Sequence, residues 1–125
     1  MAKKMLIVDD EADVRDFAAN FFRKRKIDCA TAASGEEAIA IVGKNRPDLV
    51  LLDIKMGGID GIETLRRLKQ IAEDLKVIMV TGTKPEAEGN LDTCLKLGAL
   101  AYIHKPLELD ELEKVVLEKL SQPDK

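Results

Sequence analysis

Short apolar runs in this chain are followed by acidic, hydroxyl or basic residues, whose side chains can bind ligands or react. Runs rich in Val, Ile and Leu, separated by helix-like segments, are typical of strands in a parallel sheet covered on both faces. Ligands bind in the crevice outside the carboxyl ends of such strands, so these side chains are expected to meet in one pocket. The runs and the residues that follow them are 5–8 with Asp9 and Asp10, 49–52 with Asp53, 77–80 with Thr81, and 100–103 with His104, Lys105 and Pro106.

Apolar residues recur at helical spacing in the segments between and after these runs. The first segment, about residues 11–26, places Val14, Phe17, Ala18 and Phe21 on one face, which predicts an amphipathic helix. The inner faces expected for the later helices are Ala38, Ile41 and Val42; Ile62, Leu65, Leu68 and Ala72; Leu91, Cys94 and Leu95; and Leu109, Leu112, Val116 and Leu120.

Helix boundaries are also marked in the sequence. Ser34 with Glu37 forms a capping-box pattern at the start of the second helix, and Asp60 with Glu63 opens the third. Gly43 is the expected stop of the second helix.

One further strand is expected at residues 27–31, where apolar and polar residues alternate as they do near the lateral edge of a sheet. Strands and helices in strict alternation predict an α/β fold. A chain of 125 residues suits one domain, and the expected bounds are 1–121, with 122–125 as a tail or the start of a linker. The net charge of −3 gives no indication of direct nucleic-acid binding.

The sequence favours a cytoplasmic protein without a membrane partner. Cys29 and Cys94 lie far apart and lack metal-binding spacing, which is typical of reduced, intracellular proteins. The N-terminus leads directly into a strand-length run without a signal-peptide pattern, and apolar stretches stay well below the roughly 18 residues that a spanning helix needs.

The predicted pocket has the chemistry of a phosphate acceptor. The carboxylates of Asp9, Asp10 and Asp53 repel one another unless a cation neutralises them, and oxygen ligands of this kind suit Mg²⁺. One carboxylate can then act as a nucleophile and carry an aspartyl phosphate. Lys105 offers a cation, and Thr81 a hydroxyl donor, to the oxygens of the transferred group. The chain lacks nucleotide-binding glycine loops, so a nucleotide is not the expected donor.

These residues together resemble the receiver domains of two-component response regulators, over about residues 4–120. The resemblance implies a flavodoxin-like fold, with a five-stranded parallel sheet in the order 2-1-3-4-5, as is common among doubly wound proteins. The motifs that carry it are Val8-Asp9-Asp10-Glu11; Leu51-Leu52-Asp53-Ile54-Lys55-Met56 followed by Asp60-Gly61; Thr81-Gly82; and Gly98-Ala99 leading to Tyr102 and Lys105-Pro106.

The resemblance also implies roles for single residues. Asp53 would accept a phosphoryl group from a sensor histidine kinase or a histidine phosphotransfer protein in a phosphorelay. Asp10, Asp53 and the backbone carbonyl of Lys55 would bind Mg²⁺, and Asp9 would bind it through a water molecule.

The remaining family roles concern the coupling of phosphorylation to partner binding. Thr81 and Tyr102 would be the coupled pair that reports phosphorylation, Gly82 the small residue that leaves the phosphoryl group reachable, and Lys105 the phosphate-binding cation, followed by Pro106 in a cis peptide bond. The face built by the helix near 91–98, the strand 100–103 and the helix 109–120 would then bind an unknown downstream protein, and a phosphorylation-dependent dimer is left open. Such a switch catalyses only its own phosphorylation and dephosphorylation, either as a stand-alone receiver or as part of a longer regulator.

One departure and three alternatives accompany this interpretation. The family usually has Pro where this chain has Gly57, so the loop after Asp53 is costlier to order. A Mg²⁺-dependent aspartyl-phosphate phosphatase of haloacid-dehalogenase type would need Asp-x-Asp-x-Thr after the first strand, which residues 9–13 do not match. A flavodoxin-like electron carrier would need aromatic residues to stack a flavin, and Tyr102 is the only Tyr in a chain without Trp. Taken alone, Asp10 also suits a simple helix cap.

Overall fold

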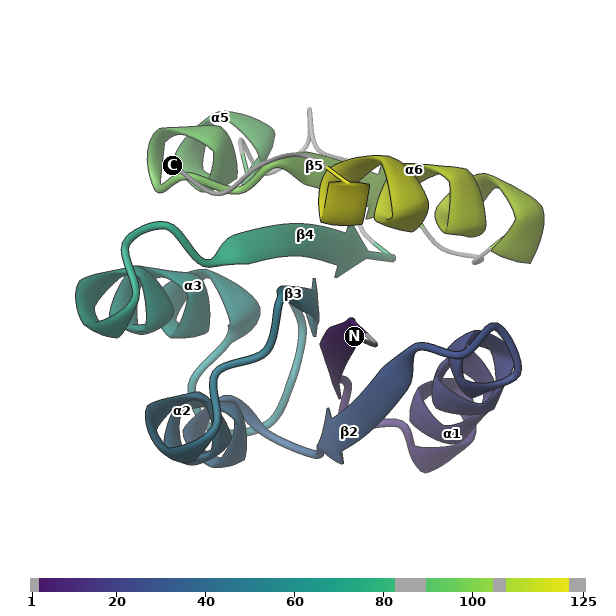
Figure 1. Ribbon diagram of the computed structural model, residues 1–125. Helices are drawn as coiled ribbons and strands as arrows, with labels where there is room; N and C mark the ends of the chain where they lie inside the picture. Colours follow the sequence, from purple (N-terminus) through teal and green to yellow (C-terminus); the bar gives the residue numbers. More distant parts are fainter. Residues whose placement is uncertain (1–2, 83–89, 105–107, 122–125) are drawn as a thin grey trace.

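Strands and helices alternate along the chain in the computed structural model, which describes residues 3–82, 90–104 and 108–121 (Figure 1). The strands are β1 (Lys4–Val8), β2 (Asp28–Ala32), β3 (Leu49–Asp53), β4 (Lys76–Thr81) and β5 (Ala101–His104). The helices are α1 (Ala12–Arg23), α2 (Gly35–Lys44), α3 (Gly61–Ile71), α5 (Asn90–Lys96) and α6 (Leu109–Ser121).

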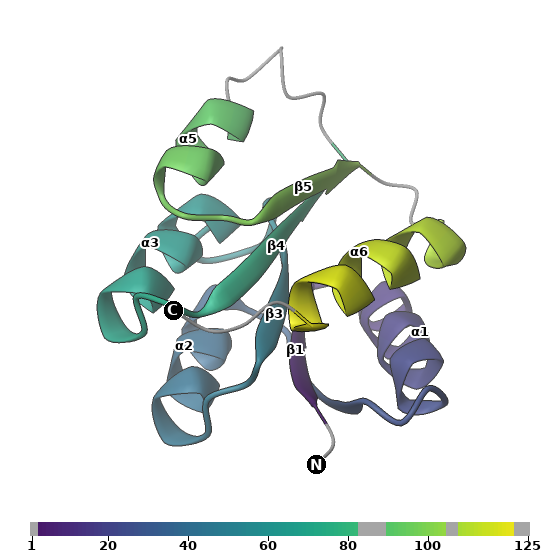
Figure 2. The same cartoon turned by 45° about the horizontal axis from the view of Figure 1, so that its top comes forward.

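The five strands form one parallel sheet in the order β2-β1-β3-β4-β5. Helices α1 and α6 cover one face of the sheet, and α2, α3 and α5 cover the other, so the fold has three layers (Figures 1 and 2). The predicted α/β fold and strand order are thereby confirmed. Across the described ranges, the structure holds no helix with the length and apolar character that crossing a bilayer requires.

The core lies in two layers, one on each face of the sheet. Strands β3 and β4 are buried at every position, which explains why the runs 49–52 and 77–80 within them are continuously apolar rather than alternating. The layer under α1 and α6 includes Met5, Ile7, Phe22, Leu49, Ile78, Leu112 and Val116. The layer under α2, α3 and α5 includes Leu6, Val8, Val50, Leu52, Leu65, Leu68, Met79 and Cys94.

Helix α1 buries the predicted face only in part. Ala18 is buried as expected, but the other buried positions are Ala19 and Phe22, whereas Phe17 is 64% exposed. Phe21 is half-buried, with the guanidinium of Arg25 lying 3.6 Å above its ring. The prediction for Phe17 was therefore wrong. The two alanines let the helix approach the sheet closely, and Phe22 rather than Phe17 fills the space against the strands.

The predicted starts of α2 and α3 are confirmed, and one predicted stop is not. The Ser34 hydroxyl accepts a hydrogen bond from the Glu37 amide at 3.1 Å, and the Asp60 carboxylate accepts one from the Glu63 amide at 2.9 Å. Helix α2 continues through Gly43 and closes at Asn45, whose amide donates to Ile41 at 2.8 Å. Gly43 therefore lies within the helix, where the intrahelical bonds outweigh its weak helix propensity.

The face of α5 also differs from its prediction. Cys94 is buried as expected, but Leu95 is 48% exposed, so the leucine belongs to the surface of the helix. A helix as short as Asn90–Lys96 has too few positions for apolar spacing to define its inner face.

Both thiols are expected to react slowly in the folded protein. Burial raises the pKa of Cys29 and of Cys94 from the ordinary 9.0 to about 11. Because the thiolate is the reactive form, iodoacetamide at pH 8 should modify the native thiols about 100-fold more slowly than those of the urea-unfolded chain.

The same pKa values predict a loss of stability in alkali. Between pH 9 and 11 the unfolded chain loses its thiol protons first, so the free energy of unfolding should fall as the pH rises through that window.

For the alkylation prediction, mass spectrometry of timed iodoacetamide reactions measures the modification rates of the two thiols. Equal rates for the folded and unfolded chains at pH 8 would contradict this expectation.

Candidate functional site

Three acidic side chains lie together at the carboxyl ends of β1 and β3. Asp9 and Asp10 follow β1, and Asp53 is the last residue of the neighbouring strand β3. One carboxylate oxygen from each residue lies within 4.8 Å of the other two. Asp9 and Asp53 are each only 4% exposed, whereas Asp10 is exposed. The parallel sheet therefore brings together acidic residues that are more than forty positions apart in the sequence.

The carboxylates of Asp9 and Asp10 face different partners. Asp9 accepts a hydrogen bond from the Glu11 amide at 2.9 Å, and its backbone carbonyl accepts one from Arg15 at 2.7 Å. Asp10 accepts a hydrogen bond from the Gly57 amide at 3.3 Å. The N-cap position of α1 is Glu11 rather than Asp10, so Asp10 faces the loop after β3 instead of capping the helix.

Apolar side chains surround the buried side of this acidic cluster. A cavity of about 10 Å³ lies between the sheet and α1, and Asp9 and Asp53 form its polar lining. A low local dielectric strengthens the repulsion among nearby carboxylates, and a divalent cation would relieve it. The apolar residues that line the cavity are Ile7, Val8, Val14, Ala18, Leu51 and Val80.

The backbone around Asp53 is held closely on both sides. The Ile54 amide donates to the Val80 carbonyl at 3.0 Å, which extends the pairing of β3 with β4 beyond the strand. The Gly61 amide donates to the Ile54 carbonyl at 2.7 Å, which fixes the start of α3 against the end of β3. A Cβ atom at Gly61 would lie 2.2 Å from the Asp53 carbonyl oxygen, so only glycine fits this approach.

The other predicted site residues lie in several parts of the chain. Thr81 ends β4 and is fully buried, and the exposed Gly82 follows it. Tyr102 is half-buried on β5, and its ring meets that of His104 edge to face, with the ring centroids 5.9 Å apart. Lys55 is exposed in the loop after β3. Lys105 and Pro106 lie outside the described residues.

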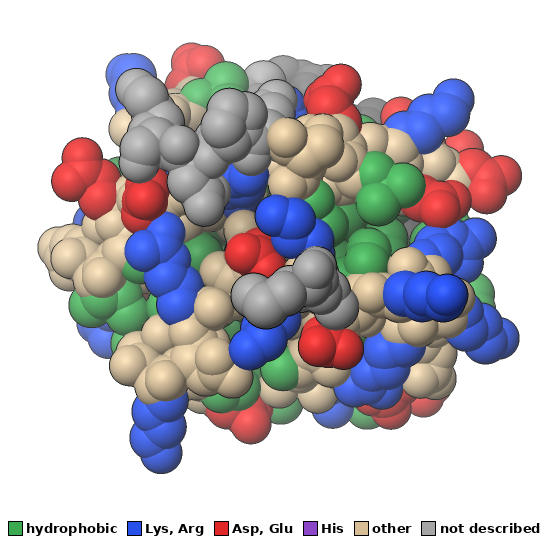
Figure 3. Space-filling view, in the orientation of Figure 1, with side chains coloured by type: hydrophobic (Ala, Val, Ile, Leu, Met, Phe, Trp, Pro, Cys, Tyr) green, Lys and Arg blue, Asp and Glu red, His purple; other side chains and the backbone are tan. Residues whose placement is uncertain are grey.

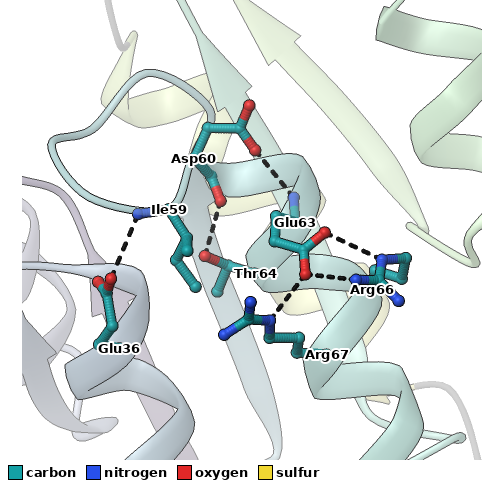
Figure 4. A network of polar contacts seen from close by, with 7 residues as sticks. All are labelled: Glu36, Ile59, Asp60, Glu63, Thr64, Arg66 and Arg67. Atoms are coloured by element: carbon teal, nitrogen blue, oxygen red, sulfur yellow. Dashed lines mark hydrogen bonds and ion pairs between the residues drawn. The ribbon is translucent and has the colours of Figure 1, made fainter.

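Glu36 is a contact residue that sequence reasoning did not single out. Its carboxylate accepts a hydrogen bond from the Ile59 amide at 3.3 Å and thereby links α2 to the loop that precedes α3 (Figure 4). An acidic residue in the first turn of a helix is ordinary, because it complements the helix dipole. The sequence therefore carries no signal that distinguishes Glu36 from other acids in such turns.

The donor set of the acidic cluster fits a hard divalent cation. Carboxylate oxygens are the ligands that Mg²⁺ prefers, and Mg²⁺ needs only a few protein ligands beside its waters. Within 3–82, 90–104 and 108–121, Asp9, Asp10 and Asp53 form the only group of three acidic, His or Cys side chains that are close enough to share an ion.

Known proteins share both the sequence and the fold of this chain. It is 44% identical over 119 residues to Sporulation initiation phosphotransferase F of Bacillus subtilis (strain 168), covering 93% of this chain and 92% of that protein. It is 34% identical over 121 residues to Probable C4-dicarboxylate response regulator DctR of the same organism, and it spans about half (52%) of that relative's length.

A crystal structure of a CheY-like response regulator receiver domain protein from Methanospirillum hungatei JF-1 superimposes with a TM-score of 0.91. The two are 32% identical, and the superposition covers 96% of this chain and 94% of that one. Residues 5–117 match the family described as Response regulator receiver domain. The chain therefore belongs to the receiver domain family of two-component response regulators.

Proposed function

We propose that this receiver domain is a phosphorylation switch in which Asp53 accepts a phosphoryl group. The donor would be the phosphohistidine of a sensor kinase or a phosphotransfer protein, with which receiver domains interact. The observation that carries the proposal is the grouping of three carboxylates within 4.8 Å of one another at the end of a parallel sheet. A divalent cation would relieve the repulsion within such a group, and together with a cation the group can bind the oxygens of a phosphoryl group.

Receiver domains bind Mg²⁺ at an acidic cluster, and the corresponding ligands in this chain would be Asp10, Asp53 and the backbone carbonyl of Lys55. Asp9 would act through a water molecule. When bound, Mg²⁺ supplies positive charge that neutralises the carboxylates and stabilises the oxygens of the transferred group. The hydrogen bond from Gly57 supports this assignment for Asp10, because ligating carboxylates are commonly oriented by hydrogen bonds of their own.

The proposed transfer is a single displacement at phosphorus. A carboxylate oxygen of Asp53 forms the new bond to phosphorus while the phosphorus–nitrogen bond breaks, and the electron pair returns to the donor imidazole. Lys105 and the hydroxyl of Thr81 would bind the oxygens of the phosphoryl group. Later attack by water returns the carboxylate and inorganic phosphate, so the domain turns over no outside metabolite.

The output surface would be the face formed by α5, β5 and α6. Leu95 of α5, Leu100 before β5 and Leu117 of α6 are each at least 37% exposed, so these elements carry apolar side chains that a protein partner could cover. In Figure 3, acidic and basic side chains are interspersed over the visible face. The net charge of −3 favours an unidentified downstream protein, or a second copy after phosphorylation, over a polyanion. We place the domain in the cytoplasm, which suits its free cysteines.

The proposed function is tested by intact-mass spectrometry after incubation with acetyl phosphate. With Mg²⁺ present, the protein should gain one phosphoryl group, and an excess of chelator should prevent the gain. A protein whose mass is unchanged with Mg²⁺ and acetyl phosphate would argue against phosphoryl acceptance. Uptake that is equal with and without chelator would argue against the metal site.

Thr81→Ala should separate metal binding from signalling. The substitution leaves the three carboxylates in place, so Mg²⁺ affinity measured by calorimetry should stay within about twofold. The hydroxyl's hydrogen bond to a charged phosphoryl group would be lost, and such a bond contributes about 1.5–3 kcal/mol, so the shift toward the active conformation should fall by at least tenfold.

The conformational response can be measured by NMR, as amide shifts in α5, β5 and α6 on adding beryllofluoride with Mg²⁺. A response of Thr81→Ala equal to that of the natural chain would remove Thr81 from the coupling.

A further inference from the structure

The first turn of α2 holds the loop between β3 and α3, which comprises residues 54–60 (Figure 4). Glu36 accepts a hydrogen bond from the Ile59 amide at 3.3 Å. Gly58 adopts a left-handed conformation with φ of 74°, and a Cβ atom there would lie 2.9 Å from both carboxylate oxygens of Glu36. Gly58 therefore provides both the turn and the space that the Glu36 carboxylate occupies.

The side chain of Ile59 packs against the same turn of α2. A Cβ atom at Gly35 would lie 2.8 Å from Cγ1 of Ile59 and 2.0 Å from the hydroxyl oxygen of Thr64. The Thr64 hydroxyl in turn donates to the Asp60 carbonyl at 2.7 Å, at the start of α3. Helix α2, the loop and α3 therefore meet without intervening space.

The other side of this loop reaches the acidic cluster. Two residues before Ile59, the Gly57 amide donates to the carboxylate of Asp10 at 3.3 Å. The loop therefore spans from Asp10 to Glu36, and it also carries the backbone carbonyl of Lys55. A proline at position 57, which the family usually has, carries no N–H and could not make this bond to Asp10.

We propose that Glu36 is a positioning residue for the metal site, acting through the loop and not on the ion. Two consecutive glycines leave residues 57 and 58 with wide conformational freedom, so ordering them costs entropy when the ion binds. By holding Ile59, Glu36 fixes the loop in advance and keeps the Gly57 amide against Asp10. This inference rests on the proposed Mg²⁺ site.

Calorimetric Mg²⁺ titration of the full chain tests the proposal with two substitutions at one position. Glu36→Ala removes the acceptor and should weaken Mg²⁺ binding by about fivefold, the effect of one typical hydrogen bond. Glu36→Gln keeps an acceptor oxygen but removes the charge, and its affinity should stay within about twofold of the natural chain. Glu73→Ala, which removes an exposed acid at the opposite end of the sheet, is the matched charge control and should bind Mg²⁺ as the natural chain does.

Amide hydrogen exchange and a second substitution test the role of the loop itself. Amide hydrogen exchange at Gly57 and Ile59 should be faster in Glu36→Ala than in Glu36→Gln, because the acceptor that holds the loop is lost. Adding Gly57→Ala to Glu36→Ala should recover part of the lost affinity, since alanine narrows the freedom of the loop and retains the amide. A Cβ atom at Gly57 meets nothing within 4 Å, so the second substitution is sterically allowed.

The outcomes distinguish the inference from the function on which it rests. If the natural chain binds Mg²⁺ and Glu36→Ala binds it equally well, Glu36 does not position the site and only the inference fails. If Glu36→Gln weakens binding as much as Glu36→Ala, the effect is one of charge and the positioning role is rejected. If the natural chain binds no Mg²⁺, the proposed function and the inference fail together. Circular dichroism of each variant establishes that it is folded.

Discussion

Asp53→Asn is expected to abolish phosphoryl uptake from acetyl phosphate while the protein stays folded. The amide oxygen of asparagine lacks the charge and nucleophilicity of a carboxylate, so the acceptor is lost. The substitution also removes one of three negative charges that lie within 4.8 Å of one another, so the variant should melt at a temperature equal to or above that of the natural chain. Intact mass and a thermal melt measure the two effects.

Asp48→Asn is the matched control for this prediction. Asp48 precedes β3, at the opposite end of the strand from Asp53, and its carboxylate accepts a hydrogen bond from the Lys4 amide at 2.8 Å. This variant should gain a phosphoryl group as the natural chain does. If Asp53→Asn were labelled as fully as Asp48→Asn, residue 53 would not be the acceptor.

Gly61→Ala is expected to destabilise the domain by about 3 kcal/mol or more, because the added atom has no room. Its Cβ would lie 2.2 Å from the Asp53 carbonyl oxygen and 2.6 Å from Cα of Ile54, and both of these are backbone atoms that cannot rotate away. Relief of the clash would have to move the end of β3, so Mg²⁺ binding should weaken as well. Urea denaturation measures the stability change.

Gly43→Ala gives the opposite expectation at another helical glycine. A Cβ atom there meets nothing within 4 Å, and alanine favours a helix interior over glycine by about 1 kcal/mol. Helix α2 should therefore gain stability, and the urea midpoint of Gly43→Ala should rise.

The prediction for Gly61→Ala is contradicted if its urea midpoint equals that of the natural chain. Such a result would show that the close approach of α3 to β3 is not required.

The fold was predictable because the strands are short, apolar and separated by helical patterns. Parallel strands buried on both faces are largely apolar, and β3 and β4 follow this rule except at their ends, which hold Asp53, Lys76 and Thr81. Parallel order then places the ends of β1 and β3 side by side, which is why the grouping of Asp9, Asp10 and Asp53 could be expected from the sequence alone.

The details that were not predictable depend on tertiary packing. In α1, Val14 is followed at helical spacing both by Phe17 and Phe21 and by Ala18 and Phe22, so periodicity alone could not show that Phe17 would be exposed. In the fold, Ala18, Ala19 and Phe22 pack into the core layer on this face of the sheet, and Phe17 is left exposed.

The contacts of the loop after β3 could not be predicted from the sequence for a related reason. The contact between Glu36 and Ile59 joins residues that are 23 positions apart, and it forms only when α2 and α3 pack side by side. The bond from Gly57 to Asp10 likewise needs the ends of two strands to meet.

Chemical mapping of the phosphorylated residue tests the central claim most directly. After treatment with acetyl phosphate and Mg²⁺, reduction with borohydride converts an aspartyl phosphate to homoserine, and peptide mass spectrometry locates the change. The account predicts homoserine at position 53 and at no other aspartate. Homoserine at Asp9, at Asp10 or elsewhere, with position 53 unmodified, would contradict it.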